Sequence, residues 1–316
     1  KLILISFVIL SFGSVERMGH RYENDTISCS YETLQGRLDG QYISHYKSGH
    51  IKSVGEFHNN YRNGVWSVWD STGRLRMKRN YSDPFNFTQI VPKVSDEGAI
   101  GLLNVSRYKP MKNKDGYIDF FSLRERMVIW SKRIYREVYP ENNPIFFSQN
   151  KLFSVIHKSI LQDSLTVYSP SDDHFGEKLN EKVDYDSVKV IGYKIQAEFI
   201  FDIERQVSEF RIIAICPIAV HQRTSDTSGL YWVFFEPLRN HLAQEVLGKE
   251  SKTGNVKTLD DLFFYRDFHG QIYKESNLFD LPIAETDGVV DVKRESERIE
   301  IGLIEKEHDI WIQFSK

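Results

Sequence analysis

Between residues 35 and 83 the apolar positions and the glycines follow a short repeat. Four positions recur with an offset of 24 residues: Gly40 and Gly64, Tyr42 and Trp66, Gly49 and Gly73, Ile51 and Leu75. Glycine permits the positive φ angles of tight turns, and aromatic and aliphatic residues suit the faces of a pleated strand. Each copy therefore predicts one β-hairpin, and stacked hairpins bury a row of aromatic side chains that a single hairpin leaves exposed.

The aromatic residues of the repeat allow two interpretations. Tyr42, Trp66 and Trp69 are candidates for a surface that docks a partner. A small aromatic core is the favoured alternative, because aromatic residues at strand spacing are usually buried. We expect the block to fold as a separate unit, since a connector rich in Pro, Gly, Asn and Asp follows it at residues 84–108.

Residues 109–316 combine strand and helix patterns and predict an α+β fold, with an antiparallel sheet and packed helices. Residues 193–203 alternate between apolar and mostly polar positions, and residues 210–220 form the near-continuous apolar run of a central strand. The short link between them predicts antiparallel pairing. Residues 230–235 predict a further strand.

Helical spacing of apolar residues predicts a helix at residues 124–139, with Met127, Trp130, Ile134 and Val138 on its core face. The opposite face carries basic residues, which we name as candidate partner-binding residues because arginine pairs well with carboxylates at interfaces. They are Arg124, Arg126, Lys132, Arg133 and Arg136.

Four further helices are predicted, at residues 148–162, 237–248, 258–268 and 292–314. Pro237 begins the second of these and Gly248 ends it, as these residue types favour opposite helix ends. Thr258 caps the third, with Asp261 at its third helical position.

The first residues predict export to the periplasm. Residues 2–12 form an apolar run, and the small residues Ser11 and Gly13 lie at the −3 and −1 positions of a cut before Ser14. We therefore expect a signal peptide at residues 1–13 and a flexible polar leader at residues 14–34.

Composition narrows the function classes. The chain has 316 residues, of which 41% are hydrophobic and 27% charged, as in ordinary globular proteins. A net charge of −3 leaves no basic footprint for nucleic acid. Cys216 lies in an apolar run that is typical of a buried structural thiol, and a disulfide with Cys29 is compatible with export but not indicated.

Candidate chemistry is sparse. Known nucleophile, zinc-protease, phosphate-loop and thiol motifs are missing from the sequence. Three polar clusters are more typical of solvated surface than of a metal or catalytic site, so we expect no enzyme, cofactor or metal. They are Asp172, Asp173, His174 and Glu177; Glu305, Glu307, His308 and Asp309; and His45, His50 and His58.

Two resemblances follow from these stretches. The segment "YRNGVWSVWDSTG" resembles MORN/YwqK-type repeats. Residues 109–316 resemble the GldN/PorN family of the Bacteroidota gliding-motility and type IX secretion apparatus. The motifs "RERMVIWSKRIYREVYPENN", "AEFIFDIERQVSEFRIIAICPIA", "DDLFFYRDFHGQIYKESN" and "ESERIEIGLIEKEHDIW" carry that resemblance, in order along the chain.

The second resemblance implies a non-enzymatic periplasmic structural subunit. Such a subunit would join an outer-membrane lipoprotein of the GldK/PorK type in a homo-oligomeric, ring-like assembly, with indirect membrane association. The sequence departs from the family pattern at Tyr135 and Leu281, and residues 35–83 are an addition to it. The alternatives are an exported hydrolase, or a free periplasmic binding module, that uses the repeats to hold a partner.

Overall fold

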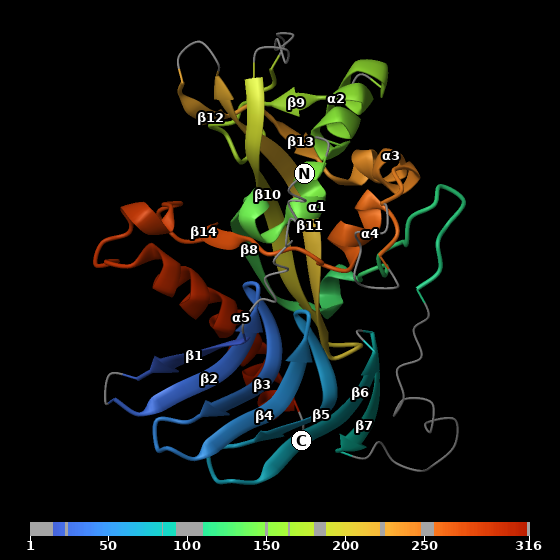
Figure 1. Cartoon of the computed structure of the whole chain (residues 1–316). Helices are drawn as coiled ribbons and strands as arrows, with labels where there is room; N and C mark the ends of the chain where they lie inside the picture. The colour runs from blue at the N-terminus through green and yellow to red at the C-terminus, as the bar shows by residue number, and fades with distance from the viewer. Residues whose placement is uncertain are drawn as a thin grey trace, which may run out of the picture.

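Two antiparallel sheets and one long helix between them organise the chain (Figure 1). The computed structural model describes residues 15–22, 25–83, 85–92, 110–148, 151–163, 165–179, 188–221, 225–247 and 256–314. The expected signal peptide at residues 1–13 lies outside the described residues. The α+β prediction is confirmed.

The first sheet is a seven-stranded meander in which each strand pairs with the next. The two predicted hairpins are β3–β4 and β5–β6, and their turns have the same conformation, with Gly49 at φ 84° and Gly73 at φ 83°. The strands are β1 Val15–Arg21, β2 Ile27–Leu34, β3 Arg37–His45, β4 Ile51–His58, β5 Tyr61–Trp69, β6 Leu75–Asp83 and β7 Asn86–Val91.

This sheet is larger than the predicted repeat block. The expected flexible leader at residues 14–34 is wrong, because β1 and β2 pair there, with Met18 opposite Tyr31. The buried side chains of Cys29 and Tyr31 continue the inward-facing row of the repeats, which explains the pairing. The expected connector at residues 84–108 contains β7, and its residues 93–108 lie outside the described residues.

The second sheet has the strand order β14-β8-β10-β11-β13-β9, with β12 paired to β11. The predicted antiparallel pairing of residues 193–203 with residues 210–220 is confirmed by β10 and β11. The strands are β8 Val128–Val138, β9 Val167–Tyr168, β10 Val188–Asp202, β11 Val207–His221, β12 Thr227–Gly229, β13 Trp232–Phe234 and β14 Gln271–Glu275.

The helix predicted at residues 124–139 is wrong, because this segment forms β8 between β10 and β14. Trp130, Lys132, Ile134, Arg136 and Val138 share one face of that strand by period-two alternation. The two basic residues interrupt the apolar run on this face, so the remaining apolar positions match helical spacing by accident.

The helices are α1 Pro144–Phe147, α2 Lys151–Asp163, α3 Arg239–Gln244, α4 Leu259–Phe264 and α5 Val292–Phe314, with 3-10 turns at Glu125–Met127, Pro140–Asn142, Glu236–Leu238 and Ile283–Glu285. The predictions for α2 and α5 are confirmed. The helix predicted at residues 258–268 is present as α4 but ends at Phe264; its Thr258 side chain accepts from the Asp261 N–H, and the Asp261 carboxylate accepts from the Thr258 N–H. The helix predicted at residues 237–248 also ends early, at Gln244.

Helix α5 connects the two sheets. Near its start, the Ser296 hydroxyl accepts from the N–H of Ile272 on β14 at 2.8 Å. Toward its end, Ile304, Ile310 and Trp311 pack with Tyr42 and Trp66 of the first sheet in one core. The repeat strands are therefore not packed as the separate unit that we expected. Among the described residues, no helix combines the length and the apolar character that a membrane span needs.

Candidate functional site

The richest cluster of ionisable side chains lies between the first sheet and α5, deep in the molecule. The sequence pattern predicts a polar surface for Glu305, Glu307, His308 and Asp309. This prediction is wrong for Glu307, which is 3% exposed, and for His308, which is fully buried, while Glu305 is half-buried and Asp309 is exposed. The helix crosses the inner face of the sheet, so two of its polar residues are covered (Figure 1).

Glu305 is the centre of this cluster. Its carboxylate accepts from the Tyr42 hydroxyl at 2.6 Å and from the Lys52 ammonium at 2.7 Å. Lys52 also contacts Asp309 at 2.6 Å. Burial opposes ionisation of Glu305, but the His308 hydrogen bond and the Lys52 charge outweigh it and hold the pKa of Glu305 well below its usual range.

His308 is held in its neutral form. Its Nδ1 lies 3.2 Å from Glu305 Oε1, and its Nε2 lies 3.3 Å from Arg62 Nη2. Because Arg62 can only donate, Nε2 accepts and Nδ1 carries the proton. Burial lowers the pKa of His308. Arg62 in turn contacts Glu307 at 2.7 Å, so each charge in the cluster has a partner.

In this arrangement His308, Glu305 and Tyr42 satisfy one another's hydrogen bonds inside the protein. General acid–base catalysis requires a histidine nitrogen within reach of a substrate proton. Both nitrogens of His308 are engaged, and its ring has no exposed surface. Burial also raises the pKa of Cys29 to about 11 and that of Cys216 to about 12, so neither thiol is an activated nucleophile.

The predicted partner-binding residues do not form one surface. Tyr42 and Trp66 are fully buried, so the aromatic-core alternative holds for them, while Trp69 is half-buried. The prediction that Arg136 lies on the surface is also wrong, because its side chain is buried and paired with Glu300. Lys132 and Arg133 pair with Glu275 at 3.3 Å and Glu198 at 3.2 Å; Arg124 and Arg126 are exposed.

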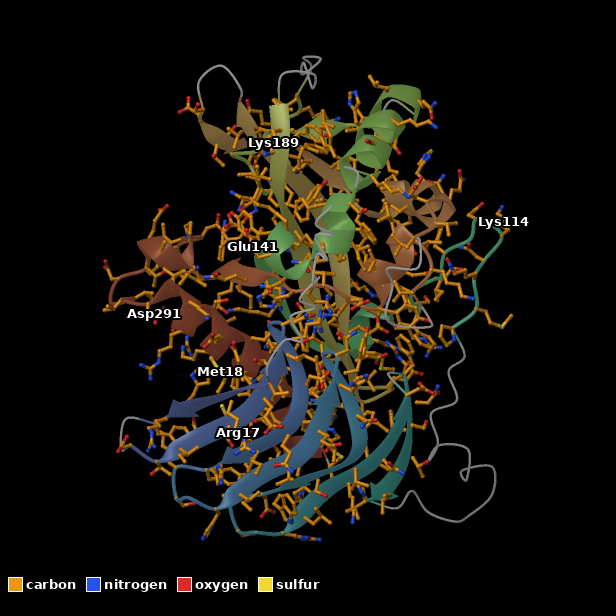
Figure 2. The ribbon with its side chains drawn as sticks, in the orientation of Figure 1. Arg17, Met18, Lys114, Glu141, Lys189 and Asp291 are labelled. Carbon is orange, nitrogen blue, oxygen red and sulfur yellow. The ribbon has the colours of Figure 1, made fainter. Side chains whose placement is uncertain are left out.

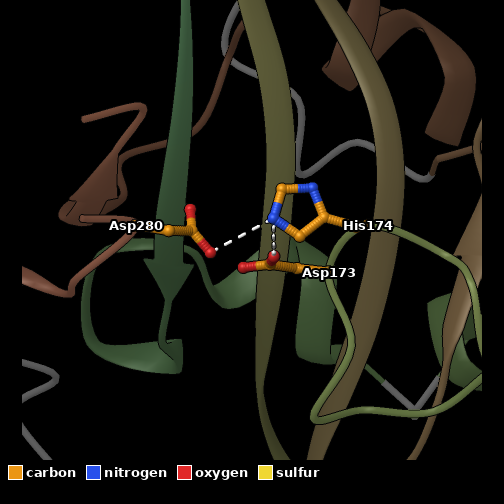
Figure 3. Close-up of side chains that lie close together, drawn as sticks. All are labelled: Asp173, His174 and Asp280. Carbon is orange, nitrogen blue, oxygen red and sulfur yellow. Dashed lines mark hydrogen bonds and ion pairs between the residues drawn. The ribbon is translucent and has the colours of Figure 1, made fainter. Parts of the chain in front are cut away.

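The second polar cluster lies at an exposed loop, where Asp173 and His174 meet Asp280 from a distant segment (Figure 3). His174 Nε2 lies 3.2 Å from Asp280 and 3.7 Å from Asp173. Asp172 shapes the loop by accepting from the N–H groups of His174 and Glu177, and the Glu177 residue is exposed.

A metal ion would have to compete with a lysine for the two carboxylates of this cluster. The Lys274 ammonium already lies 2.8 Å from both Asp173 and Asp280. Burial opposes the charge on Lys274, yet its hydrogen bonds to the two carboxylates raise its pKa. The hydrogen bond from Lys274 lowers the pKa of Asp280. The side chains therefore form a salt-bridged clamp that joins two loops.

Two cavities of about 400 Å³ each border the helix α5. One lies between the first sheet and the second, and its lining is largely aromatic: Phe57, Tyr81, Phe87, Phe199, Phe210 and Phe264. Arg62 Nε and Ser208 Oγ in its wall have no hydrogen-bond partner among the described residues. The other cavity is more polar and contains Arg136, Arg266, His269 and Glu300.

Taken together, the two sheets and the shared helix define an α+β protein whose buried carboxylates pair with basic side chains. Asp260 pairs with Arg239, and Glu307 with Arg62. The sequence model described as "Gliding motility associated protein GldN" matches residues 123–312, from the turn before β8 almost to the end of α5. The chain belongs to this family. No curated protein matches it.

The family match covers the second sheet and the helices but not the first sheet. The MORN/YwqK-type resemblance therefore stays a prediction, while the hairpins themselves are present. The buried cluster on α5 had one signal in the sequence. The polar residues 305–309 lie between Ile304 and Ile310, which shows that apolar side chains adjoin them on the helix but not that Glu307 and His308 are buried.

Proposed function

We propose that the chain is a non-enzymatic structural subunit of a gliding-motility and type IX secretion apparatus. It acts in the periplasm, at the inner side of the outer membrane. There it joins a lipoprotein of the GldK/PorK type in a ring-like assembly that contains several copies of the chain.

The observation that carries this proposal is the GldN family match over residues 123–312. The apolar run at residues 2–12 supports export. The site geometry agrees with a structural role, because His308 and Glu305 bind each other and line neither of the two described cavities.

Co-purification tests the proposal. The chain carries an affinity tag at its C-terminus, and membranes of the native host are solubilised in mild detergent. We expect one lipoprotein in roughly comparable amount and a complex far larger than the 37.0 kDa chain in size-exclusion chromatography. Recovery of the chain as a monomer with no stoichiometric partner would overturn the structural role and favour a free binding module.

A hydrolase would behave differently in the same experiment. It would dissociate from its target after turnover and would lose activity on substitution of one buried ionisable residue. His308→Asn is the informative variant, since both ring nitrogens of His308 have polar partners. An activity that disappears with this variant while the fold persists would support an enzyme.

A further inference from the structure

The link between β14 and α5 exposes apolar side chains to an unusual degree. The three most exposed large apolar residues of the described chain are Val290 at 99%, Leu278 at 91% and Phe279 at 76%, and all three lie in this link. Leu278 and Phe279 are adjacent at the tip of one loop. Large exposed apolar groups that lie together mark interaction sites more often than chance exposure.

The loop is ordered by one asparagine side chain. Asn277 Oδ1 accepts from the N–H groups of Phe279 at 3.0 Å and Leu281 at 3.2 Å, and its Nδ2 donates to the carbonyl groups of Glu275 and Leu281. These four hydrogen bonds hold the backbone of the loop, as the backbone hydrogen bonds of a helix or strand would. The apolar tip is consequently presented in one conformation.

The clamp described above fixes the same loop from outside. Asp280 has a φ of 55°, and its carboxylate is held by Lys274 at 2.8 Å and His174 at 3.2 Å (Figure 3). Beyond the loop, the buried Ile283 packs with Ile272 and Ile299. Ordering a loop in advance reduces the entropy that binding costs, so such a loop is suited to docking.

The link is also strongly acidic. Residues 275–291 contain Glu275, Asp280, Glu285, Asp287 and Asp291, and no Lys, Arg or His. Glu285 and Asp287 are exposed and make no ion pair within the described part of the chain. Figure 2 shows Asp291 at the outer edge of the molecule, on the side away from Lys114. The apolar tip therefore projects from a negatively charged margin.

We propose that residues 277–281 are an anchor that inserts Leu278 and Phe279 into an apolar pocket of another protein. Basic residues border that pocket and pair with Glu285 and Asp287. An apolar centre with a charged rim is the usual anatomy of a protein interface, and aromatic anchors supply much of its affinity. The inference rests on the proposed function, in which this partner is the lipoprotein subunit.

Two other occupants fit less well. Anionic lipid headgroups would repel Glu285 and Asp287, which have no ion pair among the described residues, whereas Glu275 and Asp280 are already paired with Lys132 and Lys274. Neither of the two cavities described above offers a basic pocket on a second copy of the chain. The aromatic cavity is lined by Arg62, Arg205 and Arg266 against five acids, and the polar cavity has Arg136, Arg266 and Lys293 against three.

The test compares tagged chains in the co-purification described above. In the anchor variant, Leu278→Ser is combined with Phe279→Ser. The control combines Val65→Ser with Leu161→Ser, which changes two exposed apolar residues elsewhere. Because all four side chains are exposed, both proteins should fold. We expect the anchor variant to recover at most about one tenth of the lipoprotein that the unmodified chain recovers, because loss of residues at the centre of an interface weakens binding by this much or more. The control should recover as much as the unmodified chain.

A charge variant separates the rim from the tip. Combining Glu285→Gln with Asp287→Asn should make lipoprotein recovery less sensitive to salt between about 50 and 500 mM NaCl, because fewer ion pairs remain to be screened.

Equal recovery by the anchor variant and the unmodified chain overturns the anchor and leaves the proposed function intact. No lipoprotein with either chain overturns both.

Two further measurements distinguish the other occupants. Vesicles of phosphatidylethanolamine and phosphatidylglycerol are mixed with the unmodified chain and the anchor variant in flotation. Light scattering on the purified chains measures self-association. Binding to vesicles, or self-association, that is lost in the anchor variant overturns a separate protein partner. We expect neither to depend on Leu278 and Phe279.

Discussion

The side chain of Trp66 shows how one residue joins the repeat to the rest of the chain. Its ring is fully buried, and its indole N–H donates to the Glu56 carbonyl at 2.9 Å. Gly55 is required beneath it, because a Cβ there would lie 2.1 Å from the ring. Arg62 covers the other side, with its guanidinium 5.0 Å from the ring centre.

Replacing Trp66 with Ala should therefore lower the free energy of unfolding by about 3–5 kcal/mol, the usual cost of deleting a buried large aromatic side chain. Urea denaturation measures it. Val65→Ala on the same strand is the matched control, since Val65 is half exposed and its loss should cost about 0.5 kcal/mol or less. A loss below about 1 kcal/mol for Trp66→Ala would mean that the ring is not core.

The two cysteines provide a second test at this scale. Cys29 and Cys216 are free, buried and part of different hydrophobic cores. Because burial raises both pKa values, to about 11 and about 12, thiolate is scarce in the native state. We expect almost no reaction of the native chain with a thiol reagent at pH 8, and two equivalents after denaturation without reductant. One equivalent or none after denaturation would indicate a disulfide or other modification.

At the scale of elements, strands with one uninterrupted pattern were predictable and β8 was not. β10 and β11 combine apolar alternation with a short link, and both signals depend only on local sequence. On β8, Arg136 occupies a core-facing position because Glu300 of α5 pairs with it. The partner lies 164 residues away along the chain, so no local pattern distinguishes this strand from an amphipathic helix.

Helix α5 was predictable in extent but not in the environment of its polar residues. Its apolar and polar residues at Ile304, Glu307 and His308 are all buried between the sheets. A surface helix keeps its polar residues in water, whereas this helix keeps Lys306 and Asp309 exposed and buries Glu307 and His308. Arg62 contacts both buried side chains, and the Tyr42 hydroxyl donates to the half-buried Glu305. The sequence shows polar residues in either environment, so the cluster was predicted to be polar surface.

The α5 cluster should make stability depend on pH. His308 has a lowered pKa, so below its ordinary value of 6.5 the unfolded chain binds a proton that the native chain resists. Glu305 also has a lowered pKa, so its contribution is present above 4.5 and declines on further acidification. We expect the free energy of unfolding to fall between pH 7 and pH 5 through His308, together with His20 and His269, whose pKa values burial also lowers, and more steeply below pH 4.5.

Urea titrations at successive pH values measure this dependence. In His308→Phe the fall between pH 7 and pH 5 should be smaller, whatever the absolute stability, because the titrating group is gone. His50→Phe is the control, as His50 is exposed in a turn and its replacement should leave the slope unchanged. An identical slope in His308→Phe would show that another group controls this range.

At the scale of the whole molecule, the contacts that join the two sheets were beyond prediction from local pattern. Tyr42 and Glu305 are 263 residues apart in sequence, and Arg62 and His308 are 246 apart. Arg79 adds a third connection, from β6 to the carbonyl of Gln206 at 2.9 Å in the turn between β10 and β11. The repeat sequence by itself predicts an independent unit, because it contains no signal for the helix α5 that covers the repeat strands.

The shared core predicts that the chain unfolds in one transition. Ile304, Ile310 and Trp311 are buried by the first sheet, so loss of that sheet exposes the apolar side of α5, which also packs on β14. Calorimetry, with tryptophan fluorescence and far-ultraviolet circular dichroism as separate probes, should give coincident curves and equal calorimetric and van't Hoff enthalpies. Trp66→Ala should move this single curve without splitting it.

Deletion of residues 15–91 tests the same coupling more severely. We expect the shortened chain to lose its cooperative transition or to aggregate, since Trp311 and its neighbours would face water and the Arg62 partner of the buried Glu307 would be absent. Restoring solubility with Trp311→Gln and Ile304→Gln in the shortened chain would support exposure of this face as the cause. A shortened chain that keeps a cooperative melt without these changes would show that residues 110–314 fold independently, and that the first sheet is an attachment rather than part of the core.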